Sequence, residues 1–103
     1  MIGAIIGDIV GSRFEFNNAK SGNFALFTQQ CDFTDDTICT VAIADAILRG
    51  EDYRTSILRW CRKYPNPMGG YGGSFAHWIT FSDPQPYNSF GNGAAMRVSP
   101  VAY

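Results

Sequence analysis

Histidine and cysteine are scarce in this chain, which has one His and three Cys in 103 residues. The three cysteines are odd in number and show no Cys-x-x-Cys spacing, so neither a disulfide framework nor a zinc site is implied. We therefore expect a reducing, cytoplasmic setting, with Cys39 acting as a small buried apolar residue. His77 adjoins Trp78 in an apolar stretch with no second His or Cys at ligand spacing, so we interpret it as a packing or surface residue.

The chain also lacks a basic stripe and a long apolar run. Its 8 Lys and Arg are scattered and balanced by 9 Asp and Glu, which argues against a nucleic-acid partner. The apolar start, residues 1–10, is interrupted by Asp8, lacks a basic leader and is too short to cross a bilayer. No membrane anchor is expected, and 103 residues with 46% apolar content predict at most one small globular domain.

Oxygen donors, by contrast, are concentrated in one place. Asp35 and Asp36 stand between Thr34 and Thr37, directly before the mostly apolar residues 38–48. Thr34 is predicted as the N-cap of a helix with both carboxylates in its first turn, where they complement the helix dipole. Helix capping explains the pattern, but hard oxygen donors this dense also suit a divalent cation. On these residues alone, both interpretations stay open.

The remaining pattern predicts helices separated by loops. Periodicity in residues 1–16 permits a strand or a helix, and residues 17–32 read as a loop. The helix that starts at Thr34 is expected to end at Gly50, and an amphipathic helix follows over residues 52–63. A short helix is expected near residues 74–81, and a last one after Gly93 that Pro100 cuts short.

The helix over residues 38–48 is apolar nearly all round, which predicts that it is enclosed by neighbouring elements. A chain of this length supplies only a few other helices and buries a modest fraction of its surface. We therefore expect a fragment that self-associates or pairs with a complementary C-terminal piece. The alternative is a compact helical domain that buries the helix unaided.

Four segments together narrow the interpretation. They are residues 7–16 (GDIVGSRFEF), 33–37 (FTDDT), 69–75 (GGYGGSF) and 91–100 (GNGAAMRVSP). In this order they resemble the ADP-ribosylglycohydrolase family, which includes the dinitrogenase reductase-activating glycohydrolases. The resemblance spans nearly the whole chain but covers only the N-terminal portion of such proteins. It implies an all-α fold, with residues 1–103 as one truncated ADP-ribosylglycohydrolase-like domain in which residues 1–16 are helical.

The resemblance also implies the site. Thr34, Asp35 and Asp36 match the family's cluster for Mg²⁺ or Mn²⁺, and Glu15 matches an acidic residue at the same metal centre. Glu15, Asp35 and Asp36 are the candidates for positioning and deprotonating the attacking water. Backbone without side chains can approach a pyrophosphate closely. The expected substrate contacts are Tyr71, Gly72, Gly73 and Ser74 at the phosphates, and Ser89, Phe90, Gly91, Asn92 and Gly93 at the ADP-ribose body.

The implied function is hydrolysis of the N- or O-glycosidic bond of an ADP-ribosylated protein or a small ADP-ribosyl compound. The family's C-terminal Asp-x-Asp followed by Ser or Thr does not occur after residue 93, so we expect slow or absent catalysis by this chain alone. The alternatives are a truncated or degenerate non-catalytic member that binds ADP-ribose weakly, and an unrelated metal-dependent phosphoesterase. Asp8 has either a structural role or a role in the site.

Overall fold

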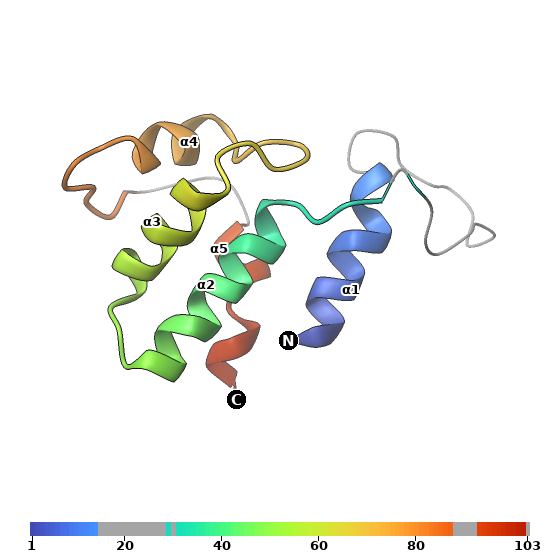
Figure 1. The fold of residues 1–103 in the computed structure, drawn as a ribbon, viewed down its shortest axis with the longest axis horizontal. Helices are drawn as coiled ribbons and strands as arrows, with labels where there is room; N and C mark the ends of the chain where they lie inside the picture. Colours follow the sequence, from blue (N-terminus) through green and yellow to red (C-terminus); the bar gives the residue numbers. More distant parts are fainter. Residues whose placement is uncertain (15–28, 30, 88–92, 103) are drawn as a thin grey trace.

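The computed structural model describes residues 1–14, 29, 31–87 and 93–102, and this part of the chain is all-α, as predicted (Figure 1). It contains five α-helices and two short 3₁₀ turns, with no strand in these ranges. One isolated parallel β-bridge joins Thr34 to Met68. The elements are α1 (Ile2–Gly11), η1 (Ser12–Phe14), α2 (Asp35–Arg49), α3 (Tyr53–Lys63), α4 (Gly73–Ile79), α5 (Gly93–Arg97) and η2 (Ser99–Ala102).

The central helix, α2, begins and ends where the sequence predicts. Thr34 is the extended N-cap, and its hydroxyl accepts the backbone N–H of Asp36 at 3.2 Å. At the other end Gly50 is left-handed, with φ 64°, and its N–H bonds to the carbonyls of Ala46 and Ile47. A residue with a Cβ adopts this conformation at a cost, which explains glycine here.

Helices α2 and α3 form the core of the molecule. The Asp52 carboxylate caps α3 by accepting the backbone N–H of Thr55 at 3.0 Å. Ser56 is fully buried, and its Oγ donates to the Ala42 carbonyl of α2 at 2.6 Å, which shows how closely these helices approach. The buried hydrophobic cluster joins α2 and α3 to α4: Ile38, Cys39, Cys61, Tyr71 and Ile79.

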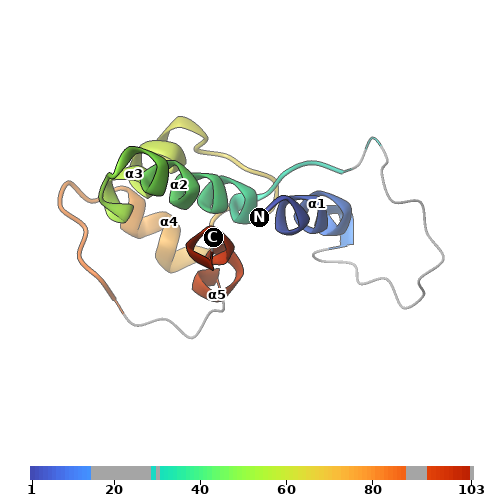
Figure 2. The same ribbon diagram turned by 90° about the horizontal axis from the view of Figure 1, so that it is seen from below.

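The other helices pack around this pair. Arg62 of α3 donates to the Ile79 carbonyl at 3.1 and 3.0 Å and to the Phe81 carbonyl at 2.8 Å, so it holds the C-terminal end of α4. Helices α1, α5 and the turn η2 all contact α2, and the view from below shows α5 beneath the α2 N-terminal half, with the two chain ends near each other (Figure 2). The first turn of α2 therefore lies where several elements meet.

The described residues of a single chain do not enclose the last turn of α2. Ile38 and Cys39 are 3% and 0% exposed, but Ile47 is 44% and Leu48 86% exposed. The physical reason is that the described neighbours of α2 cover its N-terminal part and one face, and leave the end before Gly50 uncovered. Helix α1 is also superficial, with no buried residue and Ile2 69% exposed.

Candidate functional site

The first turn of α2 is tied to α1 by the carboxylate of Asp8. Its Oδ2 accepts the backbone N–H of Thr34 at 2.8 Å and the hydroxyl of Thr37 at 2.6 Å, while Oδ1 accepts the hydroxyl of Thr34 at 2.5 Å. Three hydrogen bonds to one carboxylate favour the structural interpretation of Asp8. The Thr34 hydroxyl donates to Asp8 and accepts from Asp36, so one of its two oxygen lone pairs is left.

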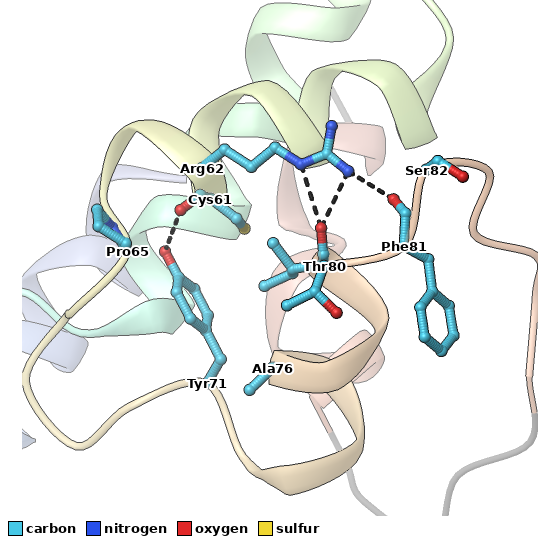
Figure 3. Close-up of a pocket in the computed structure, with 9 residues that line it drawn as sticks. Cys61, Arg62, Pro65, Tyr71, Ala76, Thr80, Phe81 and Ser82 are labelled. Atoms are coloured by element: carbon cyan, nitrogen blue, oxygen red, sulfur yellow. Dashed lines mark hydrogen bonds between the residues drawn. The ribbon is translucent and has the colours of Figure 1, made fainter.

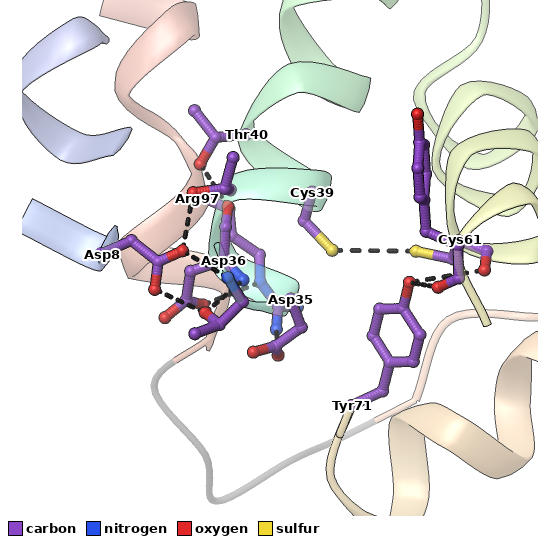
Figure 4. A network of polar contacts seen from close by, with 11 residues as sticks. Asp8, Asp35, Asp36, Cys39, Thr40, Cys61, Tyr71 and Arg97 are labelled. Atoms are coloured by element: carbon purple, nitrogen blue, oxygen red, sulfur yellow. Dashed lines mark hydrogen bonds and ion pairs between the residues drawn. The ribbon is translucent and has the colours of Figure 1, made fainter. Parts of the chain in front are cut away.

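Arg97 of α5 bridges the two adjacent carboxylates of this turn (Figure 4). Its Nη2 lies 2.6 Å from Oδ2 of Asp35, and its Nε lies 3.4 Å from Oδ1 of Asp36. The same guanidinium lies 5.0 Å from the ring centroid of Phe75 in α4. Residues 91–100 were recognised as a motif segment from the sequence, but no role was predicted for Arg97. A single cation in an otherwise uncharged motif was the signal that could have found it.

The charges around this turn are predominantly negative. Burial raises the pKa of Asp36, and the charges of Asp35 and Asp8 raise it further, against the opposing effect of Arg97. Burial alone would lower the pKa of Arg97, but neighbouring Cys39, Asp35 and Asp36 together outweigh burial, and the pKa is raised. Asp35 and Asp36 thus share one guanidinium, with the Asp8 carboxylate near enough to Asp36 to raise its pKa.

The glycine-rich segment starts beside the same turn, because Met68 forms the parallel bridge with Thr34. Gly70 and Gly72 have φ 71° and 80°, conformations that favour glycine, and carry the chain to the exposed start of α4. Tyr71 points the other way: it is 7% exposed, and its hydroxyl donates to the Tyr64 carbonyl. Burial raises the pKa of the Tyr71 phenol. A contact of this hydroxyl with a phosphate would require the inward bond to break.

The other predicted substrate residues fall into two groups. Gly72, Gly73 and Ser74 are exposed at the start of α4, where no side chain caps the backbone N–H groups. Gly93 is the first residue of α5. The rest, together with the predicted acidic residue, lie outside the described residues: Glu15, Ser89, Phe90, Gly91 and Asn92.

The four segments singled out in the sequence meet at the α2 N-terminus. Asp8 comes from the first segment, Asp35 and Asp36 from the second, Phe75 from the third and Arg97 from the fourth. The contact between Arg97 and Asp35 spans 62 positions of the chain, so the arrangement depends on the tertiary fold.

Comparison with known protein families agrees with this convergence. The model of the ADP-ribosylglycohydrolase family matches residues 1–103, the whole chain. The chain belongs to the ADP-ribosylglycohydrolase family. Membership places it in a hydrolase class and gives no support to an unrelated phosphoesterase. Comparisons with curated proteins and with solved structures returned no match.

The donor chemistry of this family member fits a divalent cation. Hard oxygens of Asp35, Asp36 and Thr34 adjoin one another, and such donors suit Mg²⁺ or Mn²⁺. The Arg97 guanidinium acts as a stand-in cation at the two carboxylates. Within the described ranges, no group of three or more His, Cys, Asp or Glu side chains is arranged to hold a metal ion. A cation here would draw on the two carboxylates, the Thr34 hydroxyl and further donors.

A separate cavity of about 410 Å³ lies between the end of α3 and helix α4 (Figure 3). Its wall includes Cys61, Tyr71 and Ile79, and none of the described residues that line it carries a carboxylate. Arg62 lines it too, yet its guanidinium is engaged by the carbonyls of Ile79 and Phe81. Hydrolytic chemistry in this glycohydrolase-family chain is therefore better sought at the acidic turn of α2.

No helix of the described residues is both long and apolar enough to cross a membrane.

Proposed function

We propose that this protein hydrolyses the N- or O-glycosidic bond between ADP-ribose and a protein side chain or small molecule, with Mg²⁺ or Mn²⁺ as cofactor. The observation that carries the proposal is the meeting of four motif segments at the α2 N-terminus, in a chain of the ADP-ribosylglycohydrolase family. The odd number of cysteines, without a Cys-x-x-Cys spacing, supports a cytoplasmic location.

Thr34, Asp35 and Asp36 would hold the cation, and Glu15 is proposed to join them. When bound, such an ion orients ribose hydroxyls and lowers the pKa of a coordinated water. The chain's own part is to keep the donors in place. Asp8 does this through two hydrogen bonds to Thr34, at 2.8 and 2.5 Å, and one to Thr37 at 2.6 Å. Donors fixed before substrate arrives do not need to reorganise during the reaction.

Asp36 is the better candidate of the two neighbours for accepting a proton from water. Its side chain is 26% exposed against 13% for Asp35, and its contact with Arg97 is longer, at 3.4 Å against 2.6 Å. A carboxylate that is more accessible and less firmly held by a guanidinium can accept a hydrogen bond from water more readily. Glu15 remains the second candidate for this role.

The start of α4 is proposed to bind the pyrophosphate. Gly72 precedes the helix with φ 80° and leaves the first-turn N–H groups without a side-chain cap. Unpaired N–H groups at a helix N-terminus are donors for a phosphate oxygen. Gly73 and Ser74 supply such donors, and the remaining contacts to the ADP-ribose body are proposed for Ser89, Phe90, Gly91, Asn92 and Gly93.

The test is release of ADP-ribose from ADP-ribosylated protein, assayed with Mg²⁺ and with Mn²⁺. Separate substrates modified on arginine and on serine distinguish N- from O-glycosidic cleavage. Any release by wild type, however slow, should fall by at least about a hundredfold in Asp36→Asn, as is typical when a general base is lost. Asp83→Asn is the matched control, because this carboxylate is 79% exposed and lies in another part of the fold.

Measurable release that is equal in wild type and Asp36→Asn would contradict the proposed role of the acidic turn. The second candidate function, a non-catalytic family member, predicts a different pair of results. ADP-ribose would then bind in a calorimetric titration, while no release occurs with either ion. The two outcomes separate binding from catalysis in the same protein sample.

A further inference from the structure

We infer that Arg97 regulates the acidic turn as an internal competitor of the divalent cation. The inference rests on the proposed function, since it concerns the same carboxylates. In the ion-free state the guanidinium neutralises Asp35 and Asp36, and an arriving cation has to displace it. Arg97 thereby sets the cation concentration at which the site fills.

The geometry of the bridge is the first argument. One guanidinium contacts both carboxylates, through Nη2 at 2.6 Å to Asp35 and Nε at 3.4 Å to Asp36. These oxygens belong to the side chains proposed as ligands. A divalent cation placed among them would lie within a few ångströms of a fixed positive charge. Like charges at such a distance repel strongly where water is largely excluded.

Burial makes the competition effective. The side chains of Arg97 and Asp35 are only 14% and 13% exposed, so bulk water screens their contact little. A charge-assisted hydrogen bond of this kind is stronger than a neutral one. The cation must break it before the Asp35 carboxylate can turn fully toward the metal.

A resting place for the displaced guanidinium is also available. Arg97 already lies 5.0 Å from the ring centroid of Phe75, and an aromatic face stabilises a cation at this distance. Phe75 belongs to α4 and Arg97 to the five-residue helix α5. Displacement of Arg97 from the acidic turn would therefore shift its contacts toward α4, which carries the proposed pyrophosphate donors.

The experiment measures Mn²⁺ binding through the electron paramagnetic resonance signal of the free ion, together with thermal unfolding. Arg97→Gln removes the charge and keeps hydrogen-bonding capacity. Without metal this variant should melt below wild type, because two carboxylates lose their counter-charge. It should bind Mn²⁺ about tenfold more tightly, and Mn²⁺ should raise its melting temperature more than that of wild type.

Arg97→Lys provides a second comparison if Arg97→Gln does not fold. A lysine ammonium is a point charge that does not reproduce the planar, two-pronged contact with both carboxylates, so Mn²⁺ affinity should again exceed that of wild type. Equal or weaker Mn²⁺ binding by both variants, with wild type binding normally, overturns the inference alone. Absence of Mn²⁺ binding in all proteins, or full binding by Asp35→Asn with Asp36→Asn, overturns the proposed metal site and this inference with it.

Discussion

The Asp8 carboxylate accepts the backbone N–H of Thr34 at 2.8 Å, so a residue of α1 fixes the first turn of α2, 26 positions further along the chain. The Thr37 hydroxyl donates to the same oxygen at 2.6 Å. Helix α1 has no fully buried residue, so these polar contacts contribute to positioning its Asp8 end against α2.

Asp8→Ala should lower the free energy of unfolding by about 2 kcal/mol, because it leaves hydrogen-bond donors at a partly buried helix start without their charged acceptor. Asp8→Asn should cost only about 1 kcal/mol, since its amide oxygen still accepts the Thr34 N–H. Urea unfolding followed by circular dichroism measures both. Equal stability of Asp8→Ala and wild type would show that water replaces the carboxylate without loss.

Asp45 predicts a pH dependence away from the site. Its Oδ2 accepts a hydrogen bond from the Trp60 indole N–H at 2.9 Å and forms an ion pair with Arg59 Nη2 at 2.6 Å. Its Oδ1 forms an ion pair with Arg49 Nε at 2.9 Å. The Trp60 hydrogen bond is the main cause that lowers the pKa of Asp45 below 3.8, with Arg59 and Arg49 adding to it. Because the pKa of Asp45 is lower in the folded protein, ionised Asp45 stabilises the fold above pH 3.8. This stabilisation is lost as the pH falls through the pKa that Asp45 has in the folded protein.

Asp45→Asn should therefore be less stable than wild type at neutral pH, and the gap should narrow as pH falls below 3.8. Denaturant unfolding of both proteins between about pH 7 and 3 measures the difference at each pH. Asp83→Asn, an exposed control, should differ little from wild type in stability. A gap for Asp45→Asn that widens on acidification would contradict the assigned direction.

Gly50→Ala should destabilise the protein by about 1 kcal/mol, because φ 64° is left-handed and no neighbouring atom would stabilise the added methyl group. Gly3→Ala is the matched control: this position is helical, with open space around the Cβ, and the change should be neutral or stabilising by up to about 1 kcal/mol. Thermal unfolding of the two variants checks the contrast. A loss of the same size at both positions would refute the conformational explanation.

Leu48→Gln should leave the free energy of unfolding within about 0.5 kcal/mol of wild type, because the leucine is 86% exposed.

We predict that wild type self-associates, or pairs with a complementary partner, through the apolar end of α2 that includes Ile47. Sedimentation velocity over a range of concentrations should show weaker association for Leu48→Gln. A wild-type chain that stays monomeric throughout this range would contradict self-association.

Local signals predicted the ends of α2 well, since a cap depends on a few adjacent residues. Thr34 is an extended N-cap whose hydroxyl accepts the Asp36 N–H, and Gly50 has the left-handed conformation that a residue without a Cβ adopts readily. The exposure of Leu48 was not predictable in this way, because it depends on which elements pack nearby. The contact of Arg97 with the acidic turn was not predicted either, because its partner Asp35 is 62 positions away in the sequence. Tyr71 was expected at the phosphates from its loop, but the fold directs its hydroxyl toward the Tyr64 carbonyl.

The most direct test of the central claim is paramagnetic broadening of assigned amide resonances by Mn²⁺. With affinity in the millimolar range, on the order of 4 kcal/mol, low Mn²⁺ concentrations should broaden the amides of Thr34, Asp35 and Asp36 first. The exposed acidic residue Asp83 should be affected little, and Asp35→Asn with Asp36→Asn should abolish the selective effect. Broadening that is uniform along the chain, or unchanged in the double variant, would contradict a cation site at the α2 N-terminus.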